Sequence, residues 1–202
     1  MYDLKDQRWL KNIQQLGIFE KRVVLTFDDG PSRQLPEILN ILKEKGVQAY
    51  FFWQSKLLYP LRPWEKVIED GHIIGSHSEN HKNLTKLSYG EQFKQIKGSV
   101  EKIERITREE VRFFRPPFGQ YNENTMLILT ELGLIPMMWE ISSYDWENKR
   151  IPEKIVSNVV DHAMDGSIIL LHETKQTVKI LPILINGLRE RGFEIGLIQK
   201  EE

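Results

Sequence analysis

Two short stretches of this 202-residue chain hold residues that could bind a metal ion. The run Thr26-Phe27-Asp28-Asp29-Gly30-Pro31 places two adjacent carboxylates after apolar residues, and His77 and His81 follow about fifty residues later. Imidazoles at positions i and i+4 can lie on one face of a helical turn, and a carboxylate from elsewhere can complete three ligands around an open fourth position. The pattern is typical of a hydrolytic zinc site in which the second carboxylate is left to act as a base.

The length and composition indicate one compact domain with no strong charge bias. At 202 residues and 40% hydrophobic content, the chain is long enough for a single substantial core. Lys and Arg number 28, Asp and Glu 29, and the net charge of -1 gives no electrostatic reason to expect a nucleic-acid partner. Because cysteine is absent, a metal ion would need nitrogen and oxygen ligands.

The ends and apolar runs of the chain bear on where the protein works. The first twenty residues are mixed and charged and lack the apolar core and cleavage site of a signal peptide. No apolar run approaches the roughly 18 residues of a membrane span, so we expect no transmembrane segment. These features favour a cytoplasmic location, or secretion if a leader has been removed.

Strand-like and helix-like segments alternate along the sequence. Strands are predicted over residues 22–27, 48–52, 73–76, 111–114, 134–139, 167–171 and 193–198. Helices are predicted over residues 34–45, around 64–68, and over 88–106, 122–132, 152–163 and 178–191. Pro36 suits the first turn of its helix, Gly46 supplies a stop, and Ser88 with Glu91 forms a possible capping box. This rhythm predicts a single-domain α/β fold closed into a parallel barrel.

Polar residues follow the predicted strands at their carboxyl ends. These residues are Asp28 and Asp29, His77 and His81, Arg115, Asp145, and His172. In α/β barrels the active site lies at that end of the strands, so residues that are distant in sequence meet there. The placement is the strongest argument from the sequence alone for catalysis.

Five ordered motifs give the chain a resemblance to the polysaccharide deacetylases of carbohydrate esterase family 4, the NodB-homology domain. The motifs are Thr26-Phe27-Asp28-Asp29-Gly30, His77-Ser78-Glu79-Asn80-His81, Arg115-Pro116-Pro117-Phe118-Gly119, Ser142-Ser143-Tyr144-Asp145-Trp146 and Leu170-Leu171-His172. The resemblance implies a distorted (β/α)7 TIM-like barrel, which we assign to residues 21–202. Residues 1–20 are separately expected to form a helical extension that packs on the barrel. It further implies metal-dependent removal of acetyl groups from a carbohydrate such as chitin oligosaccharide or peptidoglycan. The metal is usually zinc, with cobalt or nickel in some members.

The resemblance implies metal-binding and general-base roles for residues in the first three motifs. By resemblance Asp29, His77 and His81 would hold the metal, and Asp28 would act as general base on metal-activated water. Arg115 is similar to the family arginine that orients this base, and its charge would favour the carboxylate form.

The remaining motif residues would complete the reaction and form the pocket. His172 matches the general acid that protonates the leaving amine, and Asp145 matches the carboxylate that keeps this histidine protonated. The backbone N–H of Phe118 would stabilise the oxyanion. Substrate contacts are further predicted for Tyr144, Trp146 and Leu170, whereas Trp139 is expected to pack in the core.

Two positions depart from the family pattern. Ser142 stands where an aspartate is common at the start of the fourth motif, which leaves pocket detail and substrate preference open. Glu173 follows His172 where aspartate is common, a change that preserves charge. His72 is expected to make a structural hydrogen bond and His162 to be no ligand.

Other interpretations remain open at the level of the sequence. Asp-Asp-Gly-Pro alone is more often a turn, and a histidine pair at this spacing often lies on a solvated helix face. The fold and metal could serve a glycan-binding module without catalysis, or a hydrolase of a non-sugar amide. The acetylated substrate, the choice between N- and O-deacetylation, and the oligomeric state are not specified.

Overall fold

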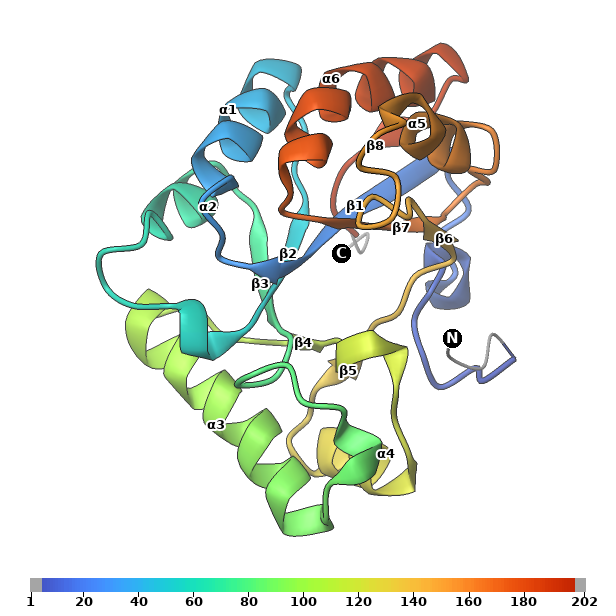
Figure 1. Ribbon diagram of the computed structural model, residues 1–202. Helices are drawn as coiled ribbons and strands as arrows, with labels where there is room; N and C mark the ends of the chain where they lie inside the picture. The colour runs from blue at the N-terminus through green and yellow to red at the C-terminus, as the bar shows by residue number, and fades with distance from the viewer. Residues whose placement is uncertain (1–4, 199–202) are drawn as a thin grey trace.

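Seven parallel strands form one curved sheet at the centre of the molecule (Figure 1). The structure is a computed structural model that describes residues 5–198. The spatial order is β5-β4-β3-β2-β1-β7-β6, with every neighbouring pair parallel. The bounds are β1 (Arg22–Gly30), β2 (Tyr50–Trp53), β3 (Ile73–Ser76), β4 (Phe113–Phe114), β5 (Ile135–Pro136), β6 (Ile141–Ser142) and β7 (Ile168–His172). The predicted distorted (β/α)7 barrel in a single domain is confirmed.

The strands that the sequence predicted agree only in part with those observed. The strand over residues 73–76 is found with the predicted bounds. The strand at Ile141–Ser142 was not predicted, because two residues carry no alternating pattern. The predicted strand over 193–198 shortens to β8 (Glu194–Ile195), which pairs with the start of β1 and lies off the order of the sheet.

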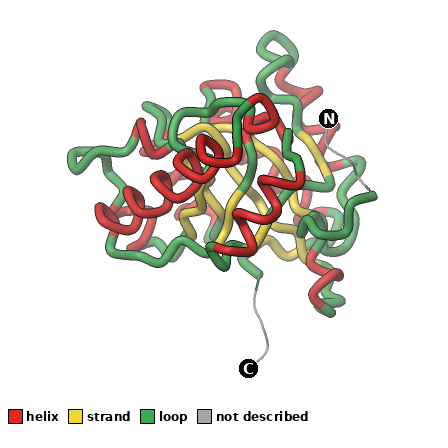
Figure 2. Tube along the Cα trace, turned by 90° about the horizontal axis from the view of Figure 1, so that it is seen from below, coloured by secondary structure: helices red, strands yellow, loops and turns green. Residues whose placement is uncertain are grey.

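Six α-helices lie outside the strands in the described part of the chain (Figure 2). They are α1 (Leu35–Lys45), α2 (Glu65–Glu69), α3 (Tyr89–Thr107), α4 (Glu123–Glu131), α5 (Pro152–Val160) and α6 (Lys175–Glu190). The predicted capping box of Ser88 and Glu91 starts α3, and Gly46, at a φ of 59°, ends α1 in the left-handed conformation that glycine adopts without strain. Between residues 5 and 198, no helix has the length and apolar character needed to cross a bilayer.

The helices pack in two groups around the sheet. Helix α6 contacts both α1 and α5 on one side, and α3 contacts α4 on the other (Figure 1). The central strands are buried on both faces, and all four residues of β2 lie in the core. Such strands are continuously apolar, which explains why the first three strands were recognisable in the sequence.

The N-terminal segment closes a seam at one side of the barrel. No described residues of β5 and β6 pair with each other, although these two strands end the sheet. Leu10 instead bridges to Met137, and Asn12 bridges to Ser167. Trp9 and Ile13 are fully buried beneath these bridges. Residues 9–13 therefore lie against the strands at this side of the barrel.

The helical character predicted for residues 1–20 was largely wrong. Only the 3-10 helix η1 (Ile13–Leu16) forms, capped by Asn12, and the rest of the described segment from residue 5 is irregular. The backbone of Leu10 bonds to Pro136, the last residue of β5, and to Met138, which is a strand-like contact that a helix cannot make. Residues 1–4 and 199–202 of the predicted extension and domain lie outside the described residues, and the division at residue 20 stays a prediction.

Candidate active site

A bulge at the end of β1 turns two adjacent carboxylates toward one site. Asp28 pairs with Phe52 and Gly30 with Trp53, so Asp29 is an extra residue without a partner in β2. Asp29 has a φ of 69°, a left-handed conformation that is uncommon outside glycine. Because consecutive side chains of a regular strand point to opposite faces, this break in the ladder is what allows both carboxylates to face the histidines.

The two histidines lie on the loop that follows β3. The expectation that they share a helical turn was wrong, because residues 77–81 are not helical and both Ser78 and His81 have positive φ. Their rings are nevertheless 5.0 Å apart between centroids. The Nδ1 of His77 lies 2.7 Å from the carbonyl oxygen of Arg115, which can only accept a hydrogen bond. His77 therefore donates from Nδ1 to this carbonyl and presents its Nε2 to the site.

Three of these side chains have donor atoms arranged as a metal ion requires. The Oδ1 atom of Asp29 lies 3.1 Å from Nε2 of His81 and 3.8 Å from Nε2 of His77. Zinc bonds of about 2.0–2.2 Å at tetrahedral angles place ligand atoms about 3.4 Å apart, so the spacing fits. Asp29, His77 and His81 also form the one candidate metal cluster among the described residues.

The electrostatics of the three side chains suit a cation. Burial raises the pKa of Asp29, but the nearby His77 and His81 outweigh it, so the pKa lies below its usual value. Burial, followed by the charge of His77, lowers the pKa of His81. Both shifts favour the protonation states that bind metal, a carboxylate and a neutral imidazole.

Arg115 is fully buried and fixes the second carboxylate, Asp28. Its Nη1 donates to Oδ1 of Asp28 at 2.7 Å and to the hydroxyl of Thr26 at 2.8 Å. Its other nitrogens donate to the carbonyl oxygens of Met137 and Met138. The remaining carboxylate oxygen of Asp28, Oδ2, lies 3.8 Å from Nε2 of His77. Asp28 is thus held beside the metal cluster rather than within it.

His172 and Asp145 form a second hydrogen-bonded pair at the site. The Nδ1 of His172 is 2.7 Å from Oδ1 of Asp145, and Oδ2 of Asp145 accepts from the backbone of His172 and from the hydroxyl of Thr177. Burial lowers the pKa of His172, but the hydrogen bond and charge of Asp145, together with Asp28 and Asp29, raise it above its usual value. The Nε2 atom, 3.9 Å from Oδ2 of Asp29, faces the metal cluster.

A cavity of about 480 Å³ joins these groups. Among the predicted substrate contacts, Phe118, Trp146 and Leu170 line it, together with Asp28, Asp29, His77, His81 and His172. The ring of Phe118 lies edge-on to His81, and that of Trp146 edge-on to His172. Tyr144 does not line the cavity and instead lies behind Trp146, with 5.3 Å between ring centroids. Ser142 contributes only a weak 3.4 Å bond from the backbone of Tyr144.

Three residues at the site were missed or misjudged from the sequence. Trp139 packs against the core as expected, but it is only half-buried and also lines the cavity, which was missed. Glu173, treated only as a charge, is a buried cavity residue that accepts from Trp53 and from the backbone of Ser32, and its pKa is raised by that burial. Gln54 donates to Oδ1 of Asp29 at 2.9 Å. Gln54 directly follows β2, so the strand-end rule used for the other residues could have found it.

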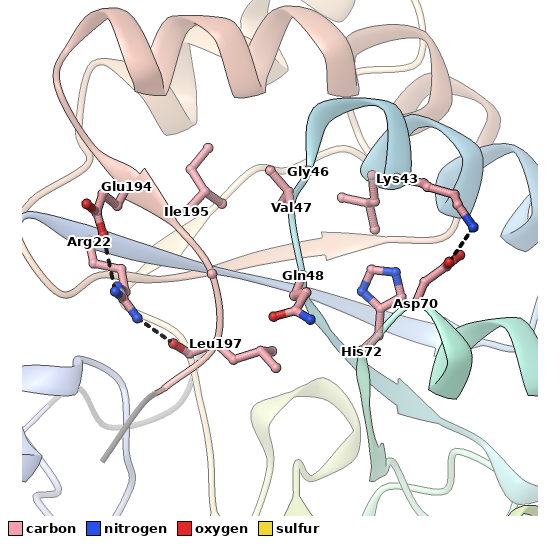
Figure 3. A pocket seen from close by; sticks show the side chains of 12 residues that line it. Arg22, Lys43, Gly46, Val47, Gln48, Asp70, His72, Glu194, Ile195 and Leu197 are labelled. Atoms are coloured by element: carbon pink, nitrogen blue, oxygen red, sulfur yellow. Dashed lines mark hydrogen bonds and ion pairs between the residues drawn. The ribbon is translucent and has the colours of Figure 1, made fainter. Parts of the chain in front are cut away.

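A second cavity, of about 390 Å³, lies at the opposite ends of the strands (Figure 3). Its lining includes Arg22 at the start of β1, Gln48 before β2 and His72 before β3. The predicted structural hydrogen bond of His72 is confirmed, because its Nδ1 accepts from the backbone of Ala49 at 3.1 Å. None of the predicted catalytic or metal-binding residues lines this cavity.

Comparison with known proteins places this geometry in a family. The family model for polysaccharide deacetylase matches residues 19–137. The chain is 33% identical to a peptidoglycan-N-acetylglucosamine deacetylase of Bacillus cereus, over 84% of this chain and 64% of that protein. It is 32% identical to a chitooligosaccharide deacetylase of Azorhizobium caulinodans, over 87% of this chain and 92% of that protein.

A solved structure agrees in fold and qualifies the inference of activity. A CE4 family pseudoenzyme from Bacillus anthracis is similar with a TM-score of 0.83 and 30% identity, over 88% of this chain and 63% of that one. This chain therefore spans less than two thirds of two of the relatives that it matches. Both the sequence match and the shared fold lead to one conclusion: the chain belongs to the polysaccharide deacetylase family.

Proposed function

We propose that the protein is a zinc-dependent hydrolase that removes N-acetyl groups from a carbohydrate such as chitin oligosaccharide or peptidoglycan. The observation that carries the proposal is the placement of a base and an acid around the metal cluster. Asp28 lies 3.8 Å from one predicted ligand, His77, and His172 lies 3.9 Å from another, Asp29. Relatives named as deacetylases of peptidoglycan and chitooligosaccharide support the substrate class.

The pairs Asp28–Arg115 and His172–Asp145 would each carry out one of the two proton transfers. A zinc ion held by Asp29, His77 and His81 would polarise the acetyl carbonyl and lower the pKa of water. Asp28, held by Arg115 through Oδ1, accepts the proton of the attacking water. His172 is kept protonated by Asp145 and donates the Nε2 proton to the leaving amine nitrogen.

The walls of the cavity complete the proposed site. The backbone N–H of Phe118 is proposed as the donor to the oxyanion that forms when water adds to the carbonyl. Trp146 and Leu170 line the same cavity as His172 and are proposed to hold the acetyl and sugar groups. Tyr144 is proposed to act through Trp146, against which its ring packs.

Acetate release tests the proposal. After the protein has been treated with a chelator, we expect added zinc to restore acetate release from acetylated chito-oligosaccharides or peptidoglycan fragments. Acetylxylan as substrate tests O-deacetylation, and Co²⁺ or Ni²⁺ in place of zinc tests other metals. Asp28→Asn should lower kcat by on the order of 10²–10⁴ while zinc still binds. Asp161→Asn, at an exposed position at the end of α5, should match the unmodified protein.

The same assay separates the alternatives. A similar structure is that of a pseudoenzyme, so a binding module without catalysis is the competing function. Zinc and glycan binding without acetate release would support that module. Release unaffected by Asp28→Asn would contradict the assigned base, and release only from a non-sugar amide would move the substrate class.

A further inference from the structure

Gln54 holds the carboxylate of the predicted metal ligand Asp29. Its side chain is only 7% exposed, and its Nε2 lies 2.9 Å from Oδ1 of Asp29. An ionised carboxylate only accepts hydrogen bonds, so the amide nitrogen of Gln54 must be the donor. We propose that Gln54 is a positioning residue that sets the affinity of the site for its metal ion.

The backbone around Gln54 joins the loops that carry the ligands. Its N–H donates to the carbonyl of Gly30 at 2.9 Å, directly after Asp29. The next two residues donate to the histidine loop, Ser55 to the carbonyl of Ser78 and Lys56 to that of Glu79. The backbone of Gln54 is therefore held in place relative to both loops, so that its side-chain amide is already positioned to donate to the carboxylate of Asp29.

The carboxylate of Asp29 needs such a partner. Its side chain is 41% exposed and sits on a bulged residue with a φ of 69°, so the strand ladder does not fix its direction. Oδ1 is the oxygen closest to both histidine nitrogens, at 3.1 and 3.8 Å. A carboxylate oxygen has two lone pairs, so the Gln54 amide can occupy one and leave the other for the cation. The hydrogen bond thus orients the ligand without competing for it.

The inference rests on the proposed metal site and predicts a selective loss of metal affinity. Hydrogen-bond partners that orient ligands typically contribute 10–100-fold to affinity. Gln54→Met preserves approximate length and removes the donor, so we expect the zinc Kd to rise by about 10–100-fold. The measurement is competition with a chromophoric chelator on the full chain, with the Tm of zinc-free protein measured alongside.

A buried glutamine away from the cluster provides the control. Gln92 is fully buried in α3, where its side chain bonds to Leu87, Asn122 and Thr125. Gln92→Met should lower the Tm and leave the zinc Kd unchanged. Gln54→Met should raise the zinc Kd. Its effect on the Tm of zinc-free protein should be no larger than that of Gln92→Met.

Three results would overturn the inference. An unchanged zinc Kd in Gln54→Met would show that Asp29 needs no such partner, whatever the Tm. An equal rise in Kd for both variants would assign the effect to general destabilisation. Failure of the unmodified protein to bind zinc would remove the metal site itself, a failure of the proposed function that is visible before any variant is compared.

Discussion

The pairing of His172 with Asp145 decides which nitrogen of the imidazole reaches the cavity. Asp145 is fully buried and is anchored independently by the hydroxyl of Thr177 and by the backbone of His172. With Nδ1 committed to this carboxylate, Nε2 is the nitrogen left to exchange a proton with substrate. The orientation of the proposed acid therefore depends on Asp145 and Thr177, which do not line the cavity.

A neutral residue at position 145 should shift the pH dependence of acetate release. Burial lowers the pKa of His172, and Asp145 supplies the largest opposing effect, so Asp145→Asn should lower that pKa. The proposed acid is active only when protonated, and activity is lost as pH rises through its pKa. We therefore expect the alkaline limb of kcat to move to lower pH, with kcat reduced on the order of 10²-fold.

The pH profile of the exposed Asp161→Asn variant provides the comparison and should match that of the unmodified protein. A lower kcat for Asp145→Asn with an unmoved alkaline limb would contradict the tuning role of Asp145.

At the scale of elements, the end of β1 is packed too tightly to accept a side chain at Gly30. A Cβ at this position would overlap the carboxyl of Glu173 and lie 2.6 Å from Nε1 of Trp53. Glu173 cannot withdraw freely, because Trp53 and the backbone of Ser32 both bond to it. The end of β1, which bears the two aspartates, is thus packed against Trp53 of β2 on one side and against Glu173, which directly follows β7, on the other.

Gly30→Ala should therefore destabilise the protein by about 1–3 kcal/mol, the usual cost of inserting a methyl group into a packed site. Urea unfolding of zinc-free protein measures the change. Gly98→Ala is the matched control, because nothing lies within 4 Å of a Cβ there and alanine is favoured over glycine in a helix such as α3. Equal effects of the two substitutions would show that the site at Gly30 is not tight.

The sequence predicted the elements with long periodic patterns and missed those that depend on pairing. Asp28, His77 and His172 could be predicted from their positions after strands, because the carboxyl ends of parallel strands lie together at one end of a barrel. The bulge at Asp29 has no pattern of its own, because it exists only in the register between β1 and β2. The position of Gln54 after β2 follows the same strand-end rule, but the contacts that define its role, and that of Glu173, depend on which side chains lie opposite them.

At the scale of the molecule, the two ends of the strands have different tasks. The cavity at the carboxyl ends holds the proposed reaction, whereas that at the amino ends contains His72, whose Nε2 has no protein partner. Burial lowers the pKa of His72 from 6.5 to about 4, with Asp70 opposing weakly. The folded protein therefore resists a protonation that the unfolded chain accepts.

This difference predicts an acid-sensitive stability. As pH falls from 6.5 to about 4, protonation of His72 favours the unfolded chain, and the penalty reaches on the order of 3 kcal/mol. His72→Asn retains an acceptor for Ala49 and should lose less free energy of unfolding over this range. Denaturant unfolding of zinc-free protein at several pH values measures it.

His162→Asn, which changes an exposed histidine, should retain the full pH dependence of the unmodified protein. Equal slopes for the unmodified protein and His72→Asn would contradict the assignment.

The bridges made by the N-terminal segment bear on when the chain can fold. Leu10 pairs with Met137 and Asn12 with Ser167, and β1 pairs with β7, so the earliest residues wait for partners more than a hundred positions later. Such distant pairings make loop closure costly and folding slow. During translation the seam and the middle of the sheet would both stay open until β7 has left the ribosome, and Asp28 of β1 and His172 of β7, the proposed base and acid, would meet only then. The barrel can therefore become stable only after residue 172, the end of β7, has been synthesised.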